Sequence, residues 1–175
     1  MKKDFFAPVA VLFAICLMIS AALALTNELT VSIIEGAEKK AAEEAQIEML
    51  PEAEGFTLVE NDHLPKEVTE IYRADNGAGY VVIMSVQGYG GDVKIICGIN
   101  TEGEIVNTKT LSHSETNGIG SKITGEEFAT QFIGKDSKLQ GVQAITGASI
   151  SSEAYIVAVK SAFEAYKIAE EGGFN

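Results

Sequence analysis

The chain has 175 residues, of which 46% are apolar and 22% charged, enough for one domain and an appendage but too few for a multi-domain enzyme. Its formal net charge is −12 and no cluster of Lys or Arg interrupts the acidic sequence, which excludes nucleic acid and anionic lipid headgroups as expected ligands. The two cysteines exclude a cysteine metal cluster and allow at most one disulfide bond.

The first predicted element is a membrane anchor over residues 5–25. This run contains no charged side chain, and as a helix it would span roughly 31 Å, the thickness of the apolar core of a bilayer. Lys2 and Lys3 precede it, so the positive-inside rule predicts a single-pass protein of the cell membrane with a cytoplasmic amino terminus and an extracytoplasmic main domain. A cleaved signal peptide is the alternative, because Ala22-Leu23-Ala24 resembles a cleavage site, although signal peptides usually have a shorter apolar core.

A stalk helix is predicted to follow the anchor. Apolar side chains recur at three- and four-residue steps over about residues 30–50, and Pro51 ends the pattern. The predicted division of the chain is therefore a cytoplasmic tip and anchor at 1–25, a stalk helix at 26–50 and an extracytoplasmic domain at 51–175.

Beyond Pro51 the pattern changes to short β-branched and aromatic runs bounded by turn signals. Strands are predicted over residues 56–59, 68–73, 80–86, 93–99 and 104–111. Asn76-Gly77 and Glu102-Gly103 are typical hairpin turns, so we expect a twisted antiparallel meander.

Helical signals return in the last third of the chain. Thr124 and Glu127 fit a capping box ahead of Phe128, and Gly134 is placed to end that helix. A second helical period runs to about Glu170. The predicted fold class is α+β, with a twisted antiparallel sheet and helices packed against it.

Three polar, glycine-containing clusters are candidate binding sites. Residues 146–152 lie just ahead of the last helix, where small side chains and free amides suit a phosphate, although an ordinary serine N-cap is the alternative. Residues 86–92 place three glycines around Tyr89, and a plain hairpin loop is equally consistent with them. Residues 113–120 form a polar loop after a strand. Neither a metal site nor a Ser-His-Asp hydrolase finds support in these residues.

Read in order, the clusters resemble a known family. Its pattern is matched by Gly88-Tyr89-Gly90-Gly91, Cys97-Gly98-Ile99-Asn100, Ser112-His113-Ser114-Glu115-Thr116 and Thr146-Gly147-Ala148-Ser149. These motifs resemble the FMN-binding domain found in the G subunit of the Rnf ion-translocating ferredoxin oxidoreductase and in the C subunit of the sodium-pumping NADH:quinone reductase. The single anchor and the Glu/Ala/Lys-rich helix after it look most like the Rnf G subunit.

The resemblance implies an electron-transfer flavoprotein subunit of a membrane-bound, ion-translocating complex, a relay without a catalytic residue or substrate turnover of its own. It implies FMN as cofactor, joined through its phosphate to Ser149 by a flavin transferase. The implied partners are other membrane redox subunits and, through residues 5–25, the lipid bilayer. The implied cofactor-binding residues are Thr146, Gly147, Ala148, Ser149 and Ser151 at the phosphate, and Tyr89, Glu115, Thr116 and Gly118 at the ring.

Three positions depart from the family pattern. Gln143 stands where an acidic residue is usual, Asn117 replaces a usual proline, and Ser149 replaces a usual threonine. A non-covalent flavin site is therefore an alternative. So are a stand-alone, membrane-anchored FMN-binding protein of an extracellular electron route and a flavin-free interaction module.

Overall fold

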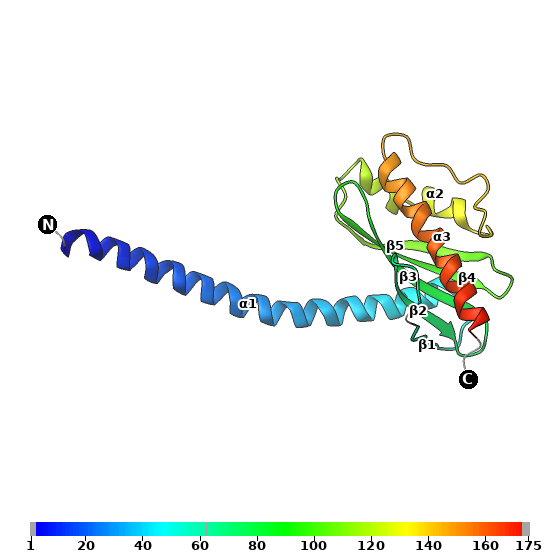
Figure 1. The fold of residues 1–175 in the computed structure, drawn as a ribbon, viewed down its shortest axis with the longest axis horizontal. Coiled ribbons are helices and arrows are strands. Elements are labelled where there is room, and N and C mark those ends of the chain that lie inside the picture. Colours follow the sequence, from blue (N-terminus) through cyan, green and yellow to red (C-terminus); the bar gives the residue numbers. More distant parts are fainter. Residues whose placement is uncertain (1–2, 62, 173–175) are drawn as a thin grey trace. The chain divides into compact units, whose positions relative to one another are not determined.

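The computed structural model describes residues 3–61 and 63–172 (Figure 1). The chain divides into two compact units, one at residues 1–42 and the other at residues 43–175. The first unit is helical, and the second holds a five-stranded sheet with its covering helices.

Helix α1 (Lys3–Met49) is continuous, so the predicted anchor and stalk form one helix and not two. The hydroxyls of Thr26 and Thr30 each donate to the carbonyl four residues earlier, at 2.8 Å. The helix ends two residues before Pro51, because proline disfavours helical backbone in the residue that precedes it. Among the residues that the structure describes, none of the helices is long and apolar enough to cross a membrane. The membrane anchor over residues 5–25 stays a prediction.

The sheet is an antiparallel meander in the order β1-β2-β3-β4-β5, as predicted. Its strands are β1 (Phe56–Leu58), β2 (Val68–Ala74), β3 (Gly79–Gln87), β4 (Asp92–Asn100) and β5 (Ile105–His113). Both predicted hairpin turns are present, and Gly77 and Gly103 each take a φ of +75° in them. Glycine adopts this left-handed conformation without the steric cost that a Cβ atom brings.

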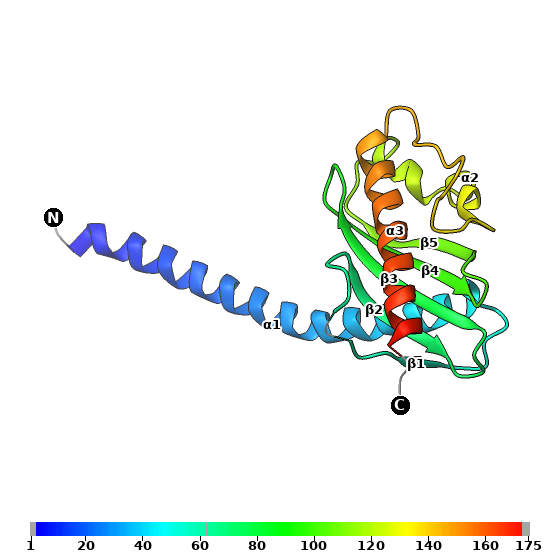
Figure 2. The ribbon, with the colours of Figure 1, turned by 45° about the vertical axis from the view of Figure 1, so that its right-hand side comes forward.

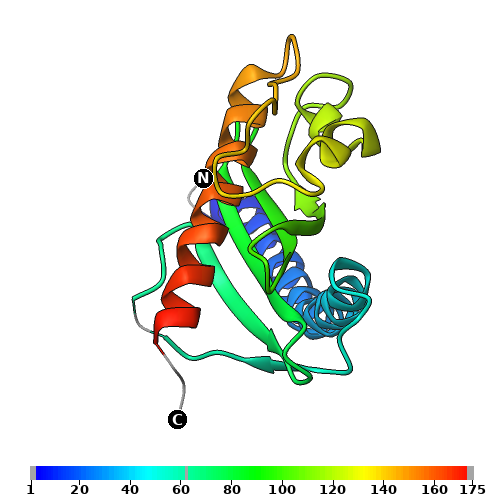
Figure 3. The same cartoon turned by 90° about the vertical axis from the view of Figure 1, so that its right-hand side faces the viewer.

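The two faces of the sheet are covered by different helices (Figure 3). Helix α3 (Ser149–Glu171) packs on one face, where alternate side chains of β3 and β4, among them Val82, Met84 and Ile95, join the main core. On the opposite face Met49, the last residue of α1, and the following Leu50 are buried. Because both faces are covered, the strands β3 and β4 are apolar almost throughout.

Gly98 in β4 lies close to the end of α1. An added Cβ there would collide with the Met49 carbonyl oxygen and lie 2.8 Å from its carbon. The Lys109 ammonium on β5 lies 2.8 Å from the Glu48 carboxylate beside this contact. Residues 43–49 therefore belong to the compact unit of the sheet, although the sequence pattern places them in the stalk.

Short helical segments follow β5 and lead to α3 (Figure 2). They are the 3-10 helix η1 (Gly120–Thr124), the α-helix α2 (Glu126–Ala129) and the 3-10 helix η2 (Thr130–Phe132). A buried aromatic cluster is formed by Phe128 in α2, Phe132 in η2 and Tyr155 in α3, with ring centroids 5.3 Å apart. These ring contacts pack α2 and η2 against α3.

The predicted capping box at Thr124 and Glu127 is wrong. Gly125 occupies the N-cap of α2 and no side chain caps that helix. The Thr124 hydroxyl instead donates to the Ser121 carbonyl at 2.8 Å, because Thr124 ends the preceding 3-10 helix and its side chain bonds within that turn.

Candidate functional site

The first turn of α3 is uncapped by any side chain. Ala148, with φ −130°, occupies its N-cap, and the first turn contains no acidic residue. The alternative of an ordinary serine N-cap therefore does not hold. The first amides of a helix lack partners within the helix and carry its positive dipole end, so this turn suits an anion.

Ser152 shapes the approach to this turn. Its hydroxyl accepts the N–H of Ile145 at 3.1 Å and donates to the Ala148 carbonyl at 2.8 Å. Gly147 lies between Ile145 and Ala148 and has a φ of +83°, a left-handed conformation in which an alanine would be strained. The result is a tight turn that presents Ser149 as the first, exposed residue of α3.

The hydroxyl of Ser151 is a polar atom without a conventional partner. Its side chain is 1% exposed, and Ser151 Oγ forms no hydrogen bond of standard geometry with the residues the structure describes. A buried, unsatisfied hydroxyl costs about 1–3 kcal/mol, so such groups in folded proteins call for an explanation. One acceptor is the Glu115 carboxylate, whose pKa this hydroxyl lowers, and a bound ligand is another.

A cavity of about 410 Å³ lies at this end of the sheet. Its walls come from the β3–β4 turn, the start of η1 and the first turn of α3. The lining residues are Tyr89, Ile119, Gly120, Gly147, Ala148, Ser149, Ile150 and Ser151. Tyr89 is 70% exposed, so its ring stands free at the mouth of the cavity. A cavity of this size holds a small organic ligand.

Glu115 lies behind this cavity with its side chain 6% exposed. One carboxylate oxygen accepts the N–H of Tyr89 at 2.8 Å and the other accepts the N–H of Gly90 at 3.0 Å. Burial favours the neutral acid, but the Ser151 hydroxyl, the two amides and the charge of His113 outweigh burial, so the pKa of Glu115 is lowered. The carboxylate is therefore ionised at neutral pH.

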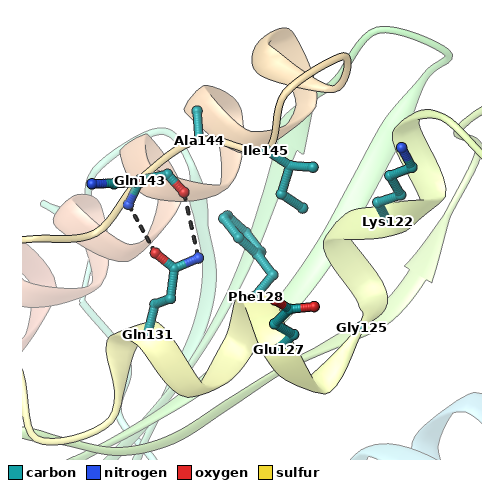
Figure 4. A pocket seen from close by; sticks show the side chains of 8 residues that line it. All are labelled: Lys122, Gly125, Glu127, Phe128, Gln131, Gln143, Ala144 and Ile145. Atoms are coloured by element: carbon teal, nitrogen blue, oxygen red, sulfur yellow. Dashed lines mark hydrogen bonds between the residues drawn. The ribbon is translucent and has the colours of Figure 1, made fainter.

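A second cavity of about 600 Å³ adjoins the segment that leads into α3 (Figure 4). Its lining includes Lys122 of η1, Phe128 of α2 and Ile145. The Gln131 side chain pairs with the backbone of Gln143, accepting its N–H at 2.9 Å and donating to its carbonyl at 3.4 Å. Gln131 thereby ties η2 to the segment that presents Ser149.

Comparisons with known proteins agree with this geometry. The sequence profile of the FMN-binding domain family matches residues 88–164. The G subunit of the Na⁺-translocating ferredoxin:NAD⁺ oxidoreductase complex of Acetobacterium woodii is 31% identical, over 90% of this chain and 89% of the relative. The G subunit of the ion-translocating oxidoreductase complex of Methanosarcina acetivorans is also 31% identical, over 98% of both chains. The chain belongs to the G-subunit family of ion-translocating oxidoreductase complexes.

The resemblance to the G-subunit family that the motifs indicated is thereby confirmed. The α+β class with an antiparallel sheet and packed helices is confirmed as well. The matched residues 88–164 run from the β3–β4 turn into α3. They contain every residue that lines the cavity of about 410 Å³, hereafter the smaller cavity.

The structure brings some of the predicted site residues together and not others. Those that line the smaller cavity are Tyr89, Gly147, Ala148, Ser149 and Ser151. Glu115 lies behind its wall and not on its surface. Thr116, Gly118 and Thr146 are exposed and are not among the lining residues.

Ile119, Gly120 and Ile150 also line the cavity. They lie inside the candidate clusters 113–120 and 146–152, but the implied set of cofactor-binding residues left them out. Ile119 and Ile150 are 53% and 56% exposed, an unusual position for isoleucine. Their apolar side chains sit inside otherwise polar motifs, which is the only signal the sequence offers for them.

Proposed function

We propose that this chain is the electron-carrying FMN protein of an Rnf-type ion-translocating oxidoreductase complex. The observation that carries the proposal is the first turn of α3, which no side chain caps and which opens into a cavity of about 410 Å³. This arrangement occurs in a chain of the G-subunit family, whose relatives are named as parts of such complexes.

The residues present fit FMN. The amides of the first turn of α3 and the Ser151 hydroxyl would bind its phosphate, with Gly147 and Ala148 leaving the backbone accessible. The exposed Tyr89 ring and the side chains of Ile119 and Ile150 would contact the planar ring. When bound, FMN supplies reversible uptake and release of electrons, and the protein supplies its position and surroundings.

Ser149 is the proposed attachment residue. Its exposed position as the first residue of α3 leaves the hydroxyl accessible to a transferase. A serine hydroxyl is too weakly acidic to react unaided, so a flavin transferase is a required partner during maturation. A covalent ester keeps the cofactor at the site at any external concentration, which is useful for a domain outside the cytoplasm.

We further propose that residues 5–25 anchor the chain in the cell membrane, with the amino terminus in the cytoplasm. The uncharged run of this segment supports the proposal. So do its exposed apolar side chains: Leu12, Phe13, Met18 and Leu23 are each more than 60% exposed in α1. Lys2 and Lys3 at its start support the orientation. Neighbouring membrane redox proteins would then be the electron donor and acceptor.

The test of covalent attachment is flavin fluorescence of the heat-denatured chain on a gel, after expression with a flavin transferase. We expect a fluorescent band for the unaltered chain and for Thr146→Ala, and none for Ser149→Ala. Ser151→Ala should keep the band, because Ser151 is assigned to binding and not to attachment. A band that disappears with Ser151→Ala and persists with Ser149→Ala would show that the attachment residue is misassigned.

A second experiment tests the assignment to a complex. The tagged chain, solubilised in detergent from its native host, should co-purify with other redox proteins of the membrane. A yellow chain that purifies alone would favour a stand-alone FMN-binding protein of an extracellular electron route. A colourless chain, purified with the transferase present, would contradict both flavoprotein functions.

A further inference from the structure

Three separate segments that form the smaller cavity meet at one side chain, the carboxylate of Glu115. The β3–β4 turn donates two backbone N–H groups to it, from Tyr89 and Gly90. The start of η1 contacts it at Gly120, where an added Cβ would collide with one of its oxygens. The first turn of α3 contributes the buried Ser151 hydroxyl, which lowers the pKa of Glu115.

The glycines around Glu115 show how closely these segments approach it. A Cβ on Gly88 would collide with the other carboxylate oxygen. A Cβ on Gly90 would lie 2.6 Å from the backbone oxygen of Ser114 and 3.0 Å from the Glu115 Cα. The β3–β4 turn can therefore reach Glu115 only because these positions lack side chains.

We propose that Glu115 is a positioning residue that assembles the cofactor cavity, holding the Tyr89 turn against the start of α3 through its ionised carboxylate. This inference rests on the proposed FMN site. The resemblance places Glu115 among the residues that line the flavin ring. In the structure it lies outside the cavity lining, and its two oxygens are already bonded to the turn.

The bonds to Glu115 hold the tip of the Tyr89 turn, whose base is closed by the pairing of Gln87 with Asp92. The Tyr89 side chain is 70% exposed, so packing contributes little to its position. The turn also closes on itself through the N–H of Gly88 and the carbonyl of Gly91, at 2.9 Å. That bond fixes the shape of the turn, whereas only the bonds to Glu115 link the Tyr89 and Gly90 amides to the loop after β5.

Glu115 is itself held in place from its own loop. Its N–H donates to Nδ1 of His113 at 3.1 Å. The Ser114 N–H donates to the Asp92 carbonyl at 3.0 Å and fixes the loop to the start of β4. The carboxylate is thus presented to the turn from a rigid base.

The experiment uses the cofactor-free full chain and measures hydrogen exchange at the Tyr89 and Gly90 amides. Glu115→Gln keeps the shape but turns one oxygen into an NH₂ donor, which faces an amide donor and cannot bond to it. We expect exchange at one or both amides to rise at least tenfold. Glu102→Gln removes an exposed carboxylate at the other end of β4 and should change neither rate.

Gly90→Ala is the second variant, which leaves Glu115 intact and forces the turn away from Ser114. It should accelerate exchange at Tyr89 in the same way, so the proposal remains testable if Glu115→Gln fails to fold. Rates within twofold of the unaltered chain in the folded variants would overturn the proposal.

Binding of free FMN, measured without the transferase by flavin fluorescence, completes the test. We expect the dissociation constant to rise at least tenfold for Glu115→Gln and to stay unchanged for Glu102→Gln. Faster exchange with unchanged FMN affinity would overturn the assembly of the cavity by Glu115. If the unaltered chain takes up no FMN even with the transferase present, the proposed function fails, while the exchange rates still decide whether Glu115 holds the turn.

Discussion

Replacement of Gly98 by alanine tests how the end of α1 covers the sheet. Gly98 lies in β4 and is not among the glycines with positive φ, so the backbone itself accepts alanine. The added methyl group would collide with the Met49 carbonyl oxygen. Because this neighbour is backbone, no side-chain rotation relieves the contact, and the end of α1 must move away from the sheet.

The cost follows from what that movement exposes. Met49 and Leu50 are 0% and 2% exposed, and full release of both would cost about 3–6 kcal/mol at roughly 1.5–3 kcal/mol for each side chain. A partial shift costs about 1–3 kcal/mol, the usual range for an overpacked core. We expect a loss of about 2 kcal/mol in unfolding free energy. For a chain of this size that lowers Tm by roughly 4–8 °C.

Thermal and urea unfolding of the full chain measure this loss. Gly172→Ala is the matched control, because Gly172 is exposed at the end of α3 with a φ of −69° that alanine adopts freely. Its effect should stay within about 0.5 kcal/mol. If Gly98→Ala is no more destabilising than Gly172→Ala, the close packing of α1 on β4 is refuted.

Three other contacts make testable predictions. Gln131→Leu removes both hydrogen bonds to Gln143. It should lower the free energy of unfolding by about 1 kcal/mol, measured by thermal unfolding, and lower the yield of flavin attachment. The control Gln140→Leu, on the exposed neighbouring loop, should change neither quantity. Burial raises the pKa of the Cys97 thiol to about 12. An alkylating reagent at pH 8 should therefore label Cys97 at least about a hundredfold more slowly in the folded chain than in guanidinium, measured by mass spectrometry. Equal labelling rates would contradict the burial of Cys97. The pKa of Glu115 is lowered by its hydrogen bonds and His113 against the opposing effect of burial, so the stability it contributes is complete above its unfolded value of about 4.3 and is lost as the pH falls through the lower folded value. The difference in urea stability between the unaltered chain and Glu115→Gln should therefore be present at pH 7 and shrink toward pH 3, and a difference independent of pH would refute this.

The strands were predictable because their signals are local. Short β-branched and aromatic runs bounded by turn signals mark β2 to β5, and the observed ends lie within two residues of the predicted ones. Asn76-Gly77 and Glu102-Gly103 determine their turns through the conformational freedom of glycine alone. The capping box at Thr124 failed because the same residues also satisfy a 3-10 helix, and only the packing of Phe128 and Phe132 selects between the two.

The sequence predicted which motifs form the site, but it did not predict what each residue contacts there. The motifs around Tyr89, Glu115 and Ser149 lie tens of residues apart, and their order alone indicated one family and one shared site. That Glu115 faces the turn and not the cavity depends on the register of β4 with β5, which places Val93 beside His113. No local pattern carries that information.

The sequence by itself determined the strands, the last helix, the family and the hydroxyl motif ahead of α3, because each depends on neighbouring residues or on motif order. Only the tertiary structure decided that the end of α1, from residue 43, closes the second face of the sheet, that Ile119 and Ile150 complete the cavity, and that the Ser151 hydroxyl is buried where it lowers the pKa of Glu115. These features arise where segments distant in the chain come within contact distance, and such proximity is a property of the packed fold.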